Sequence, residues 1–336
     1  MKTPALHTRR LSIGYRNKRS ETALHRDLNL HLNNGEITCL LGPNGSGKST
    51  LIRTLGGFQE ALGGSVRIGE ERVEDMTAGQ MSRLVSVVLT EPVDVGNMDV
   101  YSMVAFGRAP YTGFLGRLGY EDHRMVAQSL AHIGITGLQN RKFDELSDGE
   151  RQKVMIAKSL AQETPIILLD EPTAFLDFPS KVEILQLLRK AAWQHQKAVL
   201  LSTHDINLAM QFADRIWLIG KNSGLVTGIP EDLVLKGEFG NFFNREQTRF
   251  DSGTGTFRFH TPQKEFVRVE GEGLKYNWLI HALERRGFKV VTQSGESTAA
   301  EITLQPSHMF SVRKSSKLEP ILFESIQEVL TFLESK

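Results

Sequence analysis

The sequence predicts an α/β protein with a parallel sheet, followed by a small α+β domain. Two observations predict the sheet: apolar segments of strand length alternate with helical segments, and one apolar segment leads through a glycine-rich loop into a helix. A new series of short strands and helices after residue 256 predicts the second domain. The 336 residues are enough for both. We expect domains over residues 1–250 and 257–336.

The composition is that of a soluble globular protein, with 40% hydrophobic and 24% charged residues. A formal net charge of +1 gives no general attraction to nucleic acid, so no nucleic-acid partner is expected. No segment approaches the ~20 apolar residues of a membrane helix, and residues 1–10 lack the apolar core of a signal peptide. The one cysteine, Cys39, allows no disulfide within the chain, which suits a reducing compartment. These features predict a cytoplasmic protein.

Hydrophobic patterns predict the elements of the first domain in chain order. Strands are expected over 6–15, around Leu28, Leu30 and Leu32, over 36–41, on either side of Gly63-Gly64 up to Ile68, and over 83–89, with a turn at 33–35 and a helix over 49–55.

A helical stretch follows at about 97–161. Helices are expected there over 99–106 and 121–133; Glu121 and Asp122 fall in the first turn of the second, where negative charge is favoured. Alternation then returns, with strands over 166–169, 198–201 and 215–219 and helices over 180–193 and 206–212. This order predicts a parallel α/β core with a helical insertion.

The glycine-rich loop fits the phosphate-binding pattern G-x-x-x-x-G-K-[ST]. It runs Gly42-Pro43-Asn44-Gly45-Ser46-Gly47-Lys48-Ser49-Thr50, between the strand over 36–41 and the helix over 49–55. The glycines let backbone N–H groups surround phosphate oxygens, and the helix N-terminus adds partial positive charge. Lys48 adds a full charge, and the Ser49 hydroxyl is placed to bind Mg²⁺. The pattern predicts a P-loop protein that binds a nucleoside triphosphate.

Two further segments extend this prediction. Ser147 and Glu150 fit a capping box for the helix that follows, and Ser147 with Gly149 at a helix N-terminus also fits an anion site; the residues alone allow both interpretations. The buried strand over 166–169 ends in Asp170 and Glu171, which is costly for two carboxylates without a partner. We expect Asp170 to hold Mg²⁺ and Glu171 to polarise the attacking water.

These motifs, together with residues 174–177 and 201–205, resemble the nucleotide-binding subunit of ATP-binding-cassette (ABC) transporters over residues 8–250. The resemblance implies an ATPase that works as a head-to-tail dimer with itself. In such a dimer each ATP lies between one phosphate loop and the Ser147–Gly149 segment of the other copy. It also implies that Tyr15 stacks on adenine, that His204 contacts the γ-phosphate, and that Asp177 links the two sites.

One position departs from the family pattern. Near Thr90 the family usually has a glutamine that touches Mg²⁺, and here Thr90 and Glu91 are the oxygen-bearing candidates for that metal contact.

The insertion indicates a subgroup. Residues 107–111 (Gly-Arg-Ala-Pro-Tyr) followed by Glu121-Asp122 resemble cassettes that serve importers of iron–siderophore, haem or cobalamin. The alternative is a Gly/Pro turn with an exposed Arg108. The importer interpretation implies integral-membrane permease partners, an indirect substrate-binding protein and a location at the cytoplasmic side of the inner (cell) membrane. A soluble regulatory ABC-type ATPase is the alternative function.

The second domain carries no recognisable catalytic pattern. A turn or linker is expected over 251–256, a helix over 274–286, strands over 288–291, 302–304 and 310–312, and a final amphipathic helix marked by Leu322, Phe323, Ile326, Val329, Leu330 and Leu333. We expect a regulatory or dimer-supporting module.

Overall fold

The computed structural model describes residues 4–17, 20–89, 96–113, 116–174, 176–221, 223–244, 248–259, 265–291, 298–306, 309–314 and 319–335. Within it the chain divides into two units, one made of Met1–Phe243 with Ser252–Thr256 and the other of Asn244–Asp251 with Phe257–Lys336. The two units have separate hydrophobic cores.

A six-stranded sheet lies at the centre of the first unit. Its order is β11-β10-β4-β9-β8-β7, and every pairing is parallel except that of β10 with β11. The strands are β4 (Ile37–Leu41), β7 (Val85–Val88), β8 (Ile166–Leu169), β9 (Ala198–Thr203), β10 (Arg215–Gly220) and β11 (Gly224–Gly228). Every residue of β4, β8 and β9 is buried, as expected for a parallel sheet with covered faces. The predicted parallel core is confirmed.

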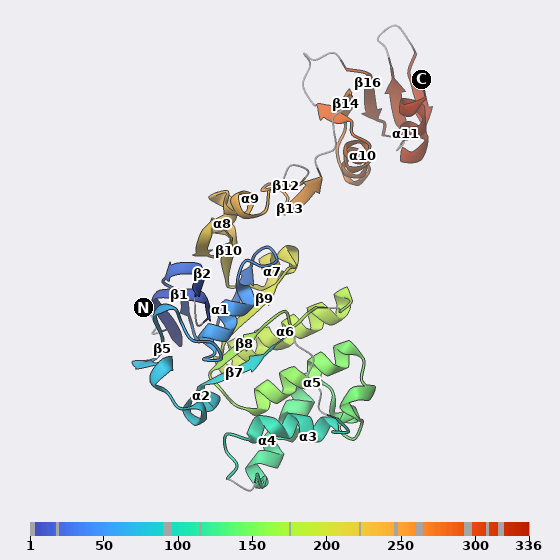
Figure 1. The fold of residues 1–336 in the computed structure, drawn as a ribbon. Coiled ribbons are helices and arrows are strands. Elements are labelled where there is room, and N and C mark those ends of the chain that lie inside the picture. Colours follow the sequence, from blue (N-terminus) through green and yellow to red (C-terminus); the bar gives the residue numbers. More distant parts are fainter. Residues whose placement is uncertain are drawn as a thin grey trace. The chain divides into compact units, whose positions relative to one another are not determined.

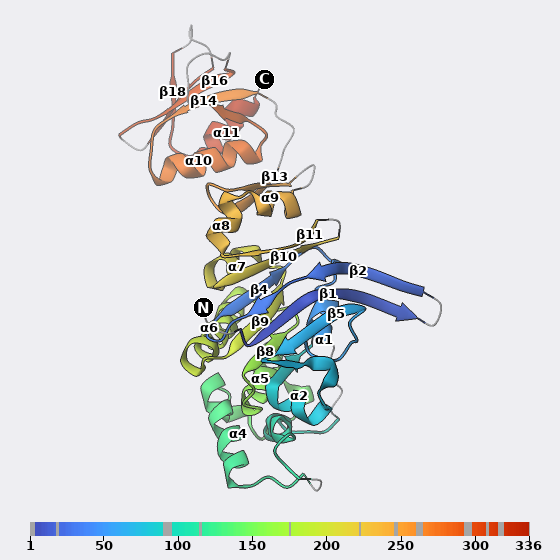
Figure 2. The ribbon, with the colours of Figure 1, turned by 90° about the vertical axis from the view of Figure 1, so that its left-hand side faces the viewer.

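Helices lie along the chain between the strands of the first unit, and two more follow its last strand (Figures 1 and 2). They are α1 (Lys48–Leu55), α2 (Ala78–Leu84), α6 (Phe178–His195), α7 (Ile206–Phe212), α8 (Pro230–Leu235) and α9 (Glu238–Phe243), with a single 3-10 turn, η1 (Val73–Asp75), before α2. The predicted helices over 49–55, 180–193 and 206–212 are confirmed. The sequence does not predict α2, because this short helix has only Met81 and Leu84 as large apolar residues, both partly buried against the core, and two residues are too few to show helical periodicity.

A second, antiparallel sheet has the order β2-β1-β5-β6, with β3 paired to β1. Its strands are β1 (Leu6–Asn17), β2 (Ser20–Leu28), β3 (His31–Leu32), β5 (Gly63–Ile68) and β6 (Glu71–Arg72). The prediction that Gly63-Gly64 separates two strands is wrong, because both glycines lie inside β5. Gly64 has φ +76°, and a Cβ there would lie 2.1 Å from the Arg10 carbonyl oxygen.

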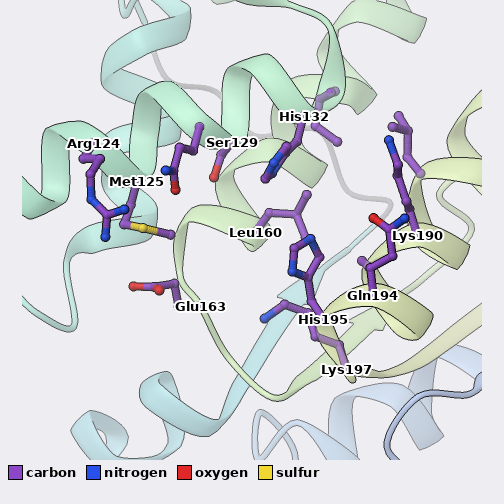
Figure 3. A pocket seen from close by; sticks show the side chains of 14 residues that line it. Arg124, Met125, Ser129, His132, Leu160, Glu163, Lys190, Gln194, His195 and Lys197 are labelled. Atoms are coloured by element: carbon purple, nitrogen blue, oxygen red, sulfur yellow. The ribbon is translucent and has the colours of Figure 1, made fainter.

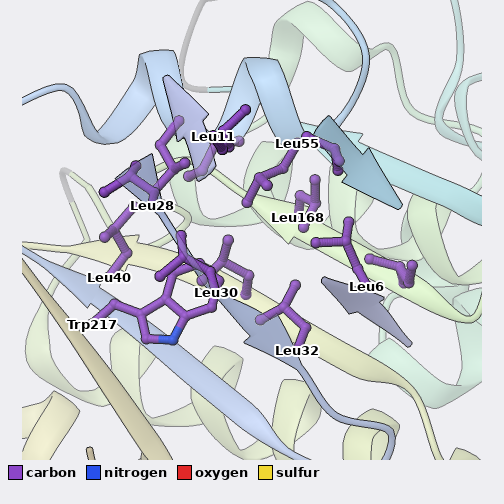
Figure 4. Packing of buried hydrophobic residues seen from close by; sticks show 14 of the residues in the cluster. Leu6, Leu11, Leu28, Leu30, Leu32, Leu40, Leu55, Leu168 and Trp217 are labelled. Carbon is purple, nitrogen blue, oxygen red and sulfur yellow. The ribbon is translucent and has the colours of Figure 1, made fainter. Parts of the chain in front are cut away.

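One hydrophobic core joins the two sheets (Figure 4). Leu28, Leu30 and Leu32 are all buried in it, although β2 ends at Leu28 and the chain resumes as β3 only at His31. They pack with residues of β4, α1, β8 and β10, among them Leu40, Leu55, Leu168 and Trp217. Cys39, also in β4, is fully buried, and burial raises the pKa of its thiol to about 12. Cys39 is therefore an inert residue of the core.

The insertion between β7 and β8 is helical, as predicted. It contains α3 (Val100–Ala105), α4 (Tyr120–Ile133) and α5 (Asp148–Ala161), with 3-10 turns η2 (Phe106–Arg108), η3 (Thr136–Leu138) and η4 (Phe143–Glu145). The three α-helices pack on one another (Figure 1). The helices expected over 99–106 and 121–133 are confirmed; Asp99 caps α3 by accepting a hydrogen bond from the Ser102 N–H at 2.7 Å.

Arg108 is buried, so the alternative of a turn with an exposed arginine is wrong. Its guanidinium donates to Asp122 Oδ1 at 2.9 Å, to the Ala161 carbonyl oxygen at 2.7 Å and to Glu163 Oε2 at 2.6 Å. The Tyr111 ring lies 4.1 Å from its Cζ. Arg108 thereby ties η2 to the start of α4 and to the end of α5.

This ion pair leads to a stability prediction. Arg108→Ala would leave the Asp122 carboxylate buried without its charged partner, so we expect the free energy of unfolding to fall by about 3 kcal/mol. The exposed pair of Arg124 with Glu121 is the matched control: Arg124→Ala should cost less than about 1 kcal/mol. Urea unfolding followed by circular dichroism measures both. Equal losses of unfolding free energy in the two variants would contradict a stabilising role for the buried Arg108–Asp122 ion pair.

The second unit is a five-stranded mixed sheet with two helices. The sheet order is β15-β14-β16-β17-β18; β14 pairs parallel with β15 and β16, and the remaining pairs are antiparallel. The elements are β12 (Thr248–Asp251), β13 (Thr256–Phe259), β14 (Phe266–Glu270), α10 (Leu274–Arg285), β15 (Lys289–Val291), β16 (Ala300–Leu304), β17 (Phe310–Arg313), β18 (Ile321–Phe323) and α11 (Ile326–Glu334). The predicted α+β architecture is confirmed.

One detail of this unit differs from expectation. Leu322 and Phe323 belong to edge strand β18, whereas the final helix begins at Ile326 after the capping residue Ser325. The apolar residues on both sides of this boundary fall at helical spacing, which is why the pattern favours one helix. The turn over 251–256 joins a small hairpin of β12 and β13, whose Phe250 and Phe257 rings lie 5.2 Å apart.

Candidate active site

The glycine-rich loop lies between buried strand β4 and helix α1. Gly45 and Gly47 have φ of +71° and +98°, in the left-handed region that favours glycine. A Cβ on Gly42 would lie 2.2 Å from the Ile219 carbonyl oxygen of β10, so the loop approaches the sheet too closely for a side chain. These two constraints fix the curved path of the loop.

Lys48 is folded back over this loop. Its Nζ donates to the Gly42 carbonyl oxygen at 2.9 Å and to that of Pro43 at 3.4 Å, and the residue is only 6% exposed. Burial lowers the pKa of the Lys48 ammonium, while the nearby Glu171 and Asp170 carboxylates act to raise it. The result is a cation held at the loop, facing two carboxylates.

The remaining loop residues differ in how their side chains are used. Ser46 Oγ is buried and has no hydrogen-bond partner in the described part of the chain, and Ser49 is exposed at the start of α1. Thr50 Oγ1 hydrogen-bonds the Tyr15 hydroxyl at 2.9 Å, while the Tyr15 residue is 54% exposed. Asn44 is exposed. Tyr15 is therefore anchored by its hydroxyl and open to solvent.

The carboxylates lie at the end of β8, joined by Ser202 at the end of β9. Ser202 Oγ donates to Asp170 Oδ1 at 2.6 Å and accepts from the Glu171 backbone N–H at 2.8 Å. The Glu171 carboxylate hydrogen-bonds His204 Nε2, and Glu171 has φ +50°. The carboxyl ends of neighbouring parallel strands thus bring Asp170, Glu171 and His204 together.

Sequence reasoning missed the role of Ser202. The register pairs Leu169 of β8 with Leu201 of β9, so the residues that follow each of them, Asp170 and Ser202, are neighbours. Two consecutive apolar strands ending in polar residues could have indicated this contact once their adjacency was assumed.

The other segment predicted to bind an anion, Ser147 to Gly149, lies at the start of α5. Ser147 caps α5, with its Oγ accepting from the Glu150 N–H at 3.3 Å and donating to Glu150 Oε2 at 2.9 Å. Gly149 follows in the first turn, and Asp177 caps α6 by accepting from the Ser180 N–H at 3.0 Å. The predicted capping box at Ser147 is confirmed. Among the described residues of one chain, the side chain of Ser147 bonds Glu150 and that of Asp177 bonds Ser180, and neither bonds the Lys48 loop.

Thr90 and Glu91, the predicted metal candidates, lie outside the described residues.

A cavity of about 490 Å³ lies apart from all these residues (Figure 3). It is lined by residues of α4 and α6, by Leu160 near the end of α5, by Glu163, and by Lys197 just before β9. The ring centroids of His132 and His195 lie 5.7 Å apart. Both histidines lie in the last turn of a helix, where a cationic side chain interacts well with the helix dipole. None of the predicted site residues lines this cavity.

The site combines a strand–loop–helix unit that carries a buried lysine with two carboxylates, a serine and a histidine at neighbouring strand ends. This arrangement defines a P-loop nucleoside triphosphatase. Comparison with protein families narrows the class. Residues 25–174 match the ABC transporter family, and residues 263–334 match the iron ABC transporter C-terminal domain.

Relatives extend the match over most of the chain. An uncharacterized ABC transporter ATP-binding protein of Methanocaldococcus jannaschii is 36% identical over 284 residues, 84% of this chain and 97% of that protein. A petrobactin import ATP-binding protein of Bacillus anthracis is 36% identical over 68% of this chain and 83% of its own length. An iron(3+)-hydroxamate import ATP-binding protein of Bacillus subtilis is 33% identical, covering 68% and 84%. This chain belongs to the ATP-binding proteins of ABC transporters.

Solved structures agree with this assignment. An inward-facing putative metal-chelate type ABC transporter matches with a TM-score of 0.60 and 28% identity, over 69% of this chain and 85% of that one. A dimeric bacterial ABC transporter cassette matches with a TM-score of 0.59 and 26% identity, over 67% and 98%. The predicted family, fold and ATPase class are confirmed. No helix in the described part of the chain is long and apolar enough to cross a membrane.

Proposed function

We propose that this ATPase drives an importer whose cargo is iron–siderophore, haem or cobalamin, and that it acts as a head-to-tail dimer bound to membrane permease subunits. The observation that carries the cargo class is the joint match of one chain to the ABC transporter family and to the iron ABC transporter C-terminal domain. The petrobactin and iron(3+)-hydroxamate import proteins among the relatives support it. A cytoplasmic location at the cell membrane, with an indirect substrate-binding protein, follows from this role.

Each site residue has a separate role in this proposal. Backbone N–H groups of the non-proline residues in the loop over 42–50, together with the Lys48 ammonium, hold the β- and γ-phosphates, and Tyr15 presents its ring to adenine. Glu171 takes the proton of the attacking water, because its carboxylate lies at the strand end facing the Lys48 charge. His204, hydrogen-bonded to Glu171, orients that carboxylate and contacts the γ-phosphate.

The residues present also fit a Mg²⁺ ion. The Ser49 hydroxyl and the Asp170 carboxylate are oxygen donors of the type that Mg²⁺ prefers, and Ser202 orients Asp170 by a hydrogen bond. When bound, the ion would neutralise phosphate charge. Thr90 and Glu91 remain candidates for a further metal contact on sequence grounds alone.

The composite site explains why Ser147, Gly149 and Asp177 are separate from Lys48 in one chain. In a head-to-tail dimer, the Ser147 hydroxyl and the N-terminus of α5 from one copy would meet the γ-phosphate on the other copy. Asp177 would link the two sites. We further propose the cassette over residues 1–250 and an accessory, regulatory or dimer-supporting domain over 257–336.

Uptake measurements in the source organism test the cargo class. Deleting the gene should abolish uptake of one labelled cargo among a ferric siderophore, haem and cobalamin, because the permease then lacks its ATPase. The parent gene should restore uptake, and Lys48→Ala should not. Unchanged uptake of all three, with ATPase activity intact in the purified protein, would favour the soluble regulatory ATPase instead.

A further inference from the structure

A buried histidine outside every recognised motif contacts the phosphate loop. His25 lies in β2 and is only 6% exposed. Its Nε2 is 2.7 Å from the Ser46 carbonyl oxygen, 21 residues further along the chain. Since a carbonyl oxygen only accepts, Nε2 carries the hydrogen and donates it to Ser46. The ring therefore bonds the backbone in the middle of the loop.

This bond fixes the direction of a neighbouring backbone donor. The peptide between Ser46 and Gly47 is planar and trans, so the Gly47 N–H points opposite to the Ser46 carbonyl. That N–H has no hydrogen-bond acceptor among the described residues. With the carbonyl turned toward β2, the N–H is turned to the other side of the loop.

A restraint on the Ser46–Gly47 peptide matters because a glycine follows it. Gly47, at φ +98°, has no Cβ to limit rotation of the peptide that precedes it. The His25 ring also lies against Gly47: a Cβ added there would be 3.5 Å from His25 Cδ2 and 3.6 Å from Nε2. The imidazole therefore restrains Gly47 both by its hydrogen bond to the adjoining peptide and by contact.

We propose that His25 is a positioning residue of the phosphate loop, holding the Ser46 carbonyl so that the Gly47 N–H is aimed at bound phosphate. The proposal rests on the nucleotide role assigned to this loop. The competing explanation is a buried histidine that merely satisfies its own polar atom. That explanation predicts a loss of stability on replacement and no specific loss of nucleotide affinity.

Two substitutions separate these explanations. His25→Leu removes the donor, and His25→Gln keeps an N–H donor at a similar reach. The control is Thr8→Val, which removes two buried hydrogen bonds away from the loop: Thr8 Oγ1 donates to the Leu28 carbonyl oxygen at 2.8 Å and accepts from the Leu30 N–H at 2.8 Å. The measurements are calorimetric titration of the full-length variants with MgADP, the KM and kcat for ATP, and the melting temperature of each.

We expect His25→Leu to weaken MgADP binding by about 5–10-fold and to raise KM by a similar factor, as loss of one hydrogen bond implies. His25→Gln should recover most of this affinity, and Thr8→Val should bind like the parent while melting lower. If His25→Leu does not fold, His25→Asn, whose amide is too short to reach, replaces it in the comparison with His25→Gln. Parental affinity in the Leu or Asn variant, or no recovery with Gln, overturns the proposal. A parent protein that does not bind MgADP would overturn the nucleotide site itself.

Discussion

Lys48→Ala is expected to lower ATP turnover by about 100-fold or more. Lys48 is the buried cation at the loop, and its ammonium is already held by the Gly42 and Pro43 carbonyl oxygens in position to meet phosphate. Neutral alanine removes the charge that the β- and γ-phosphates would meet there. The measurement is phosphate release by the purified full chain at saturating ATP.

Lys190→Ala is the matched control for this variant. Lys190 is an exposed lysine of the same unit that lines the cavity of Figure 3, so its loss should leave turnover at the parental rate. Equal activities in parent and Lys48→Ala would show that the loop does not hold the nucleotide phosphates.

Glu171→Gln is expected to retain ATP binding and to lose hydrolysis by about 10²–10⁴-fold. The amide matches the carboxylate in shape but does not take a proton from water. Binding should persist because the loop and Lys48 are unchanged. Nucleotide affinity by calorimetry, with phosphate release under the same conditions, measures both effects. A variant that hydrolyses ATP at the parental rate would exclude Glu171 as the base.

Most of the fold could be predicted from local sequence patterns. The loop over 42–50 and the strand leading to Asp170-Glu171 can be inferred from sequence because their spacing and apolar flanks are contiguous in the chain. The parallel core follows from the alternation of strand-length and helix-length segments. Leu322 and Phe323 show the limit of this reasoning, because the apolar residues of an edge strand and of the next helix together fit one helical spacing.

The contacts that sequence reasoning missed are long-range. Ser202 reaches Asp170 from 32 residues away, and His25 reaches Ser46 from 21 residues away. Ser202 and His25 are ordinary strand residues until the sheets form. Arg108 is similar: its burial depends on Asp122 and on the end of α5, so a short Gly-Arg-Ala-Pro-Tyr pattern cannot reveal whether the arginine is exposed.

The separation of Ser147 from Lys48 within one chain makes the shared site the central claim. Light scattering of Glu171→Gln with and without Mg²⁺ and ATP tests it most directly, since blocked hydrolysis should let the ATP-bound dimer accumulate. We predict the mass of a monomer without nucleotide and twice that mass with Mg²⁺ and ATP. Adding Ser147→Arg to this variant should keep it monomeric while it still binds ATP. A Glu171→Gln protein that binds ATP and keeps the monomer mass would contradict the head-to-tail account.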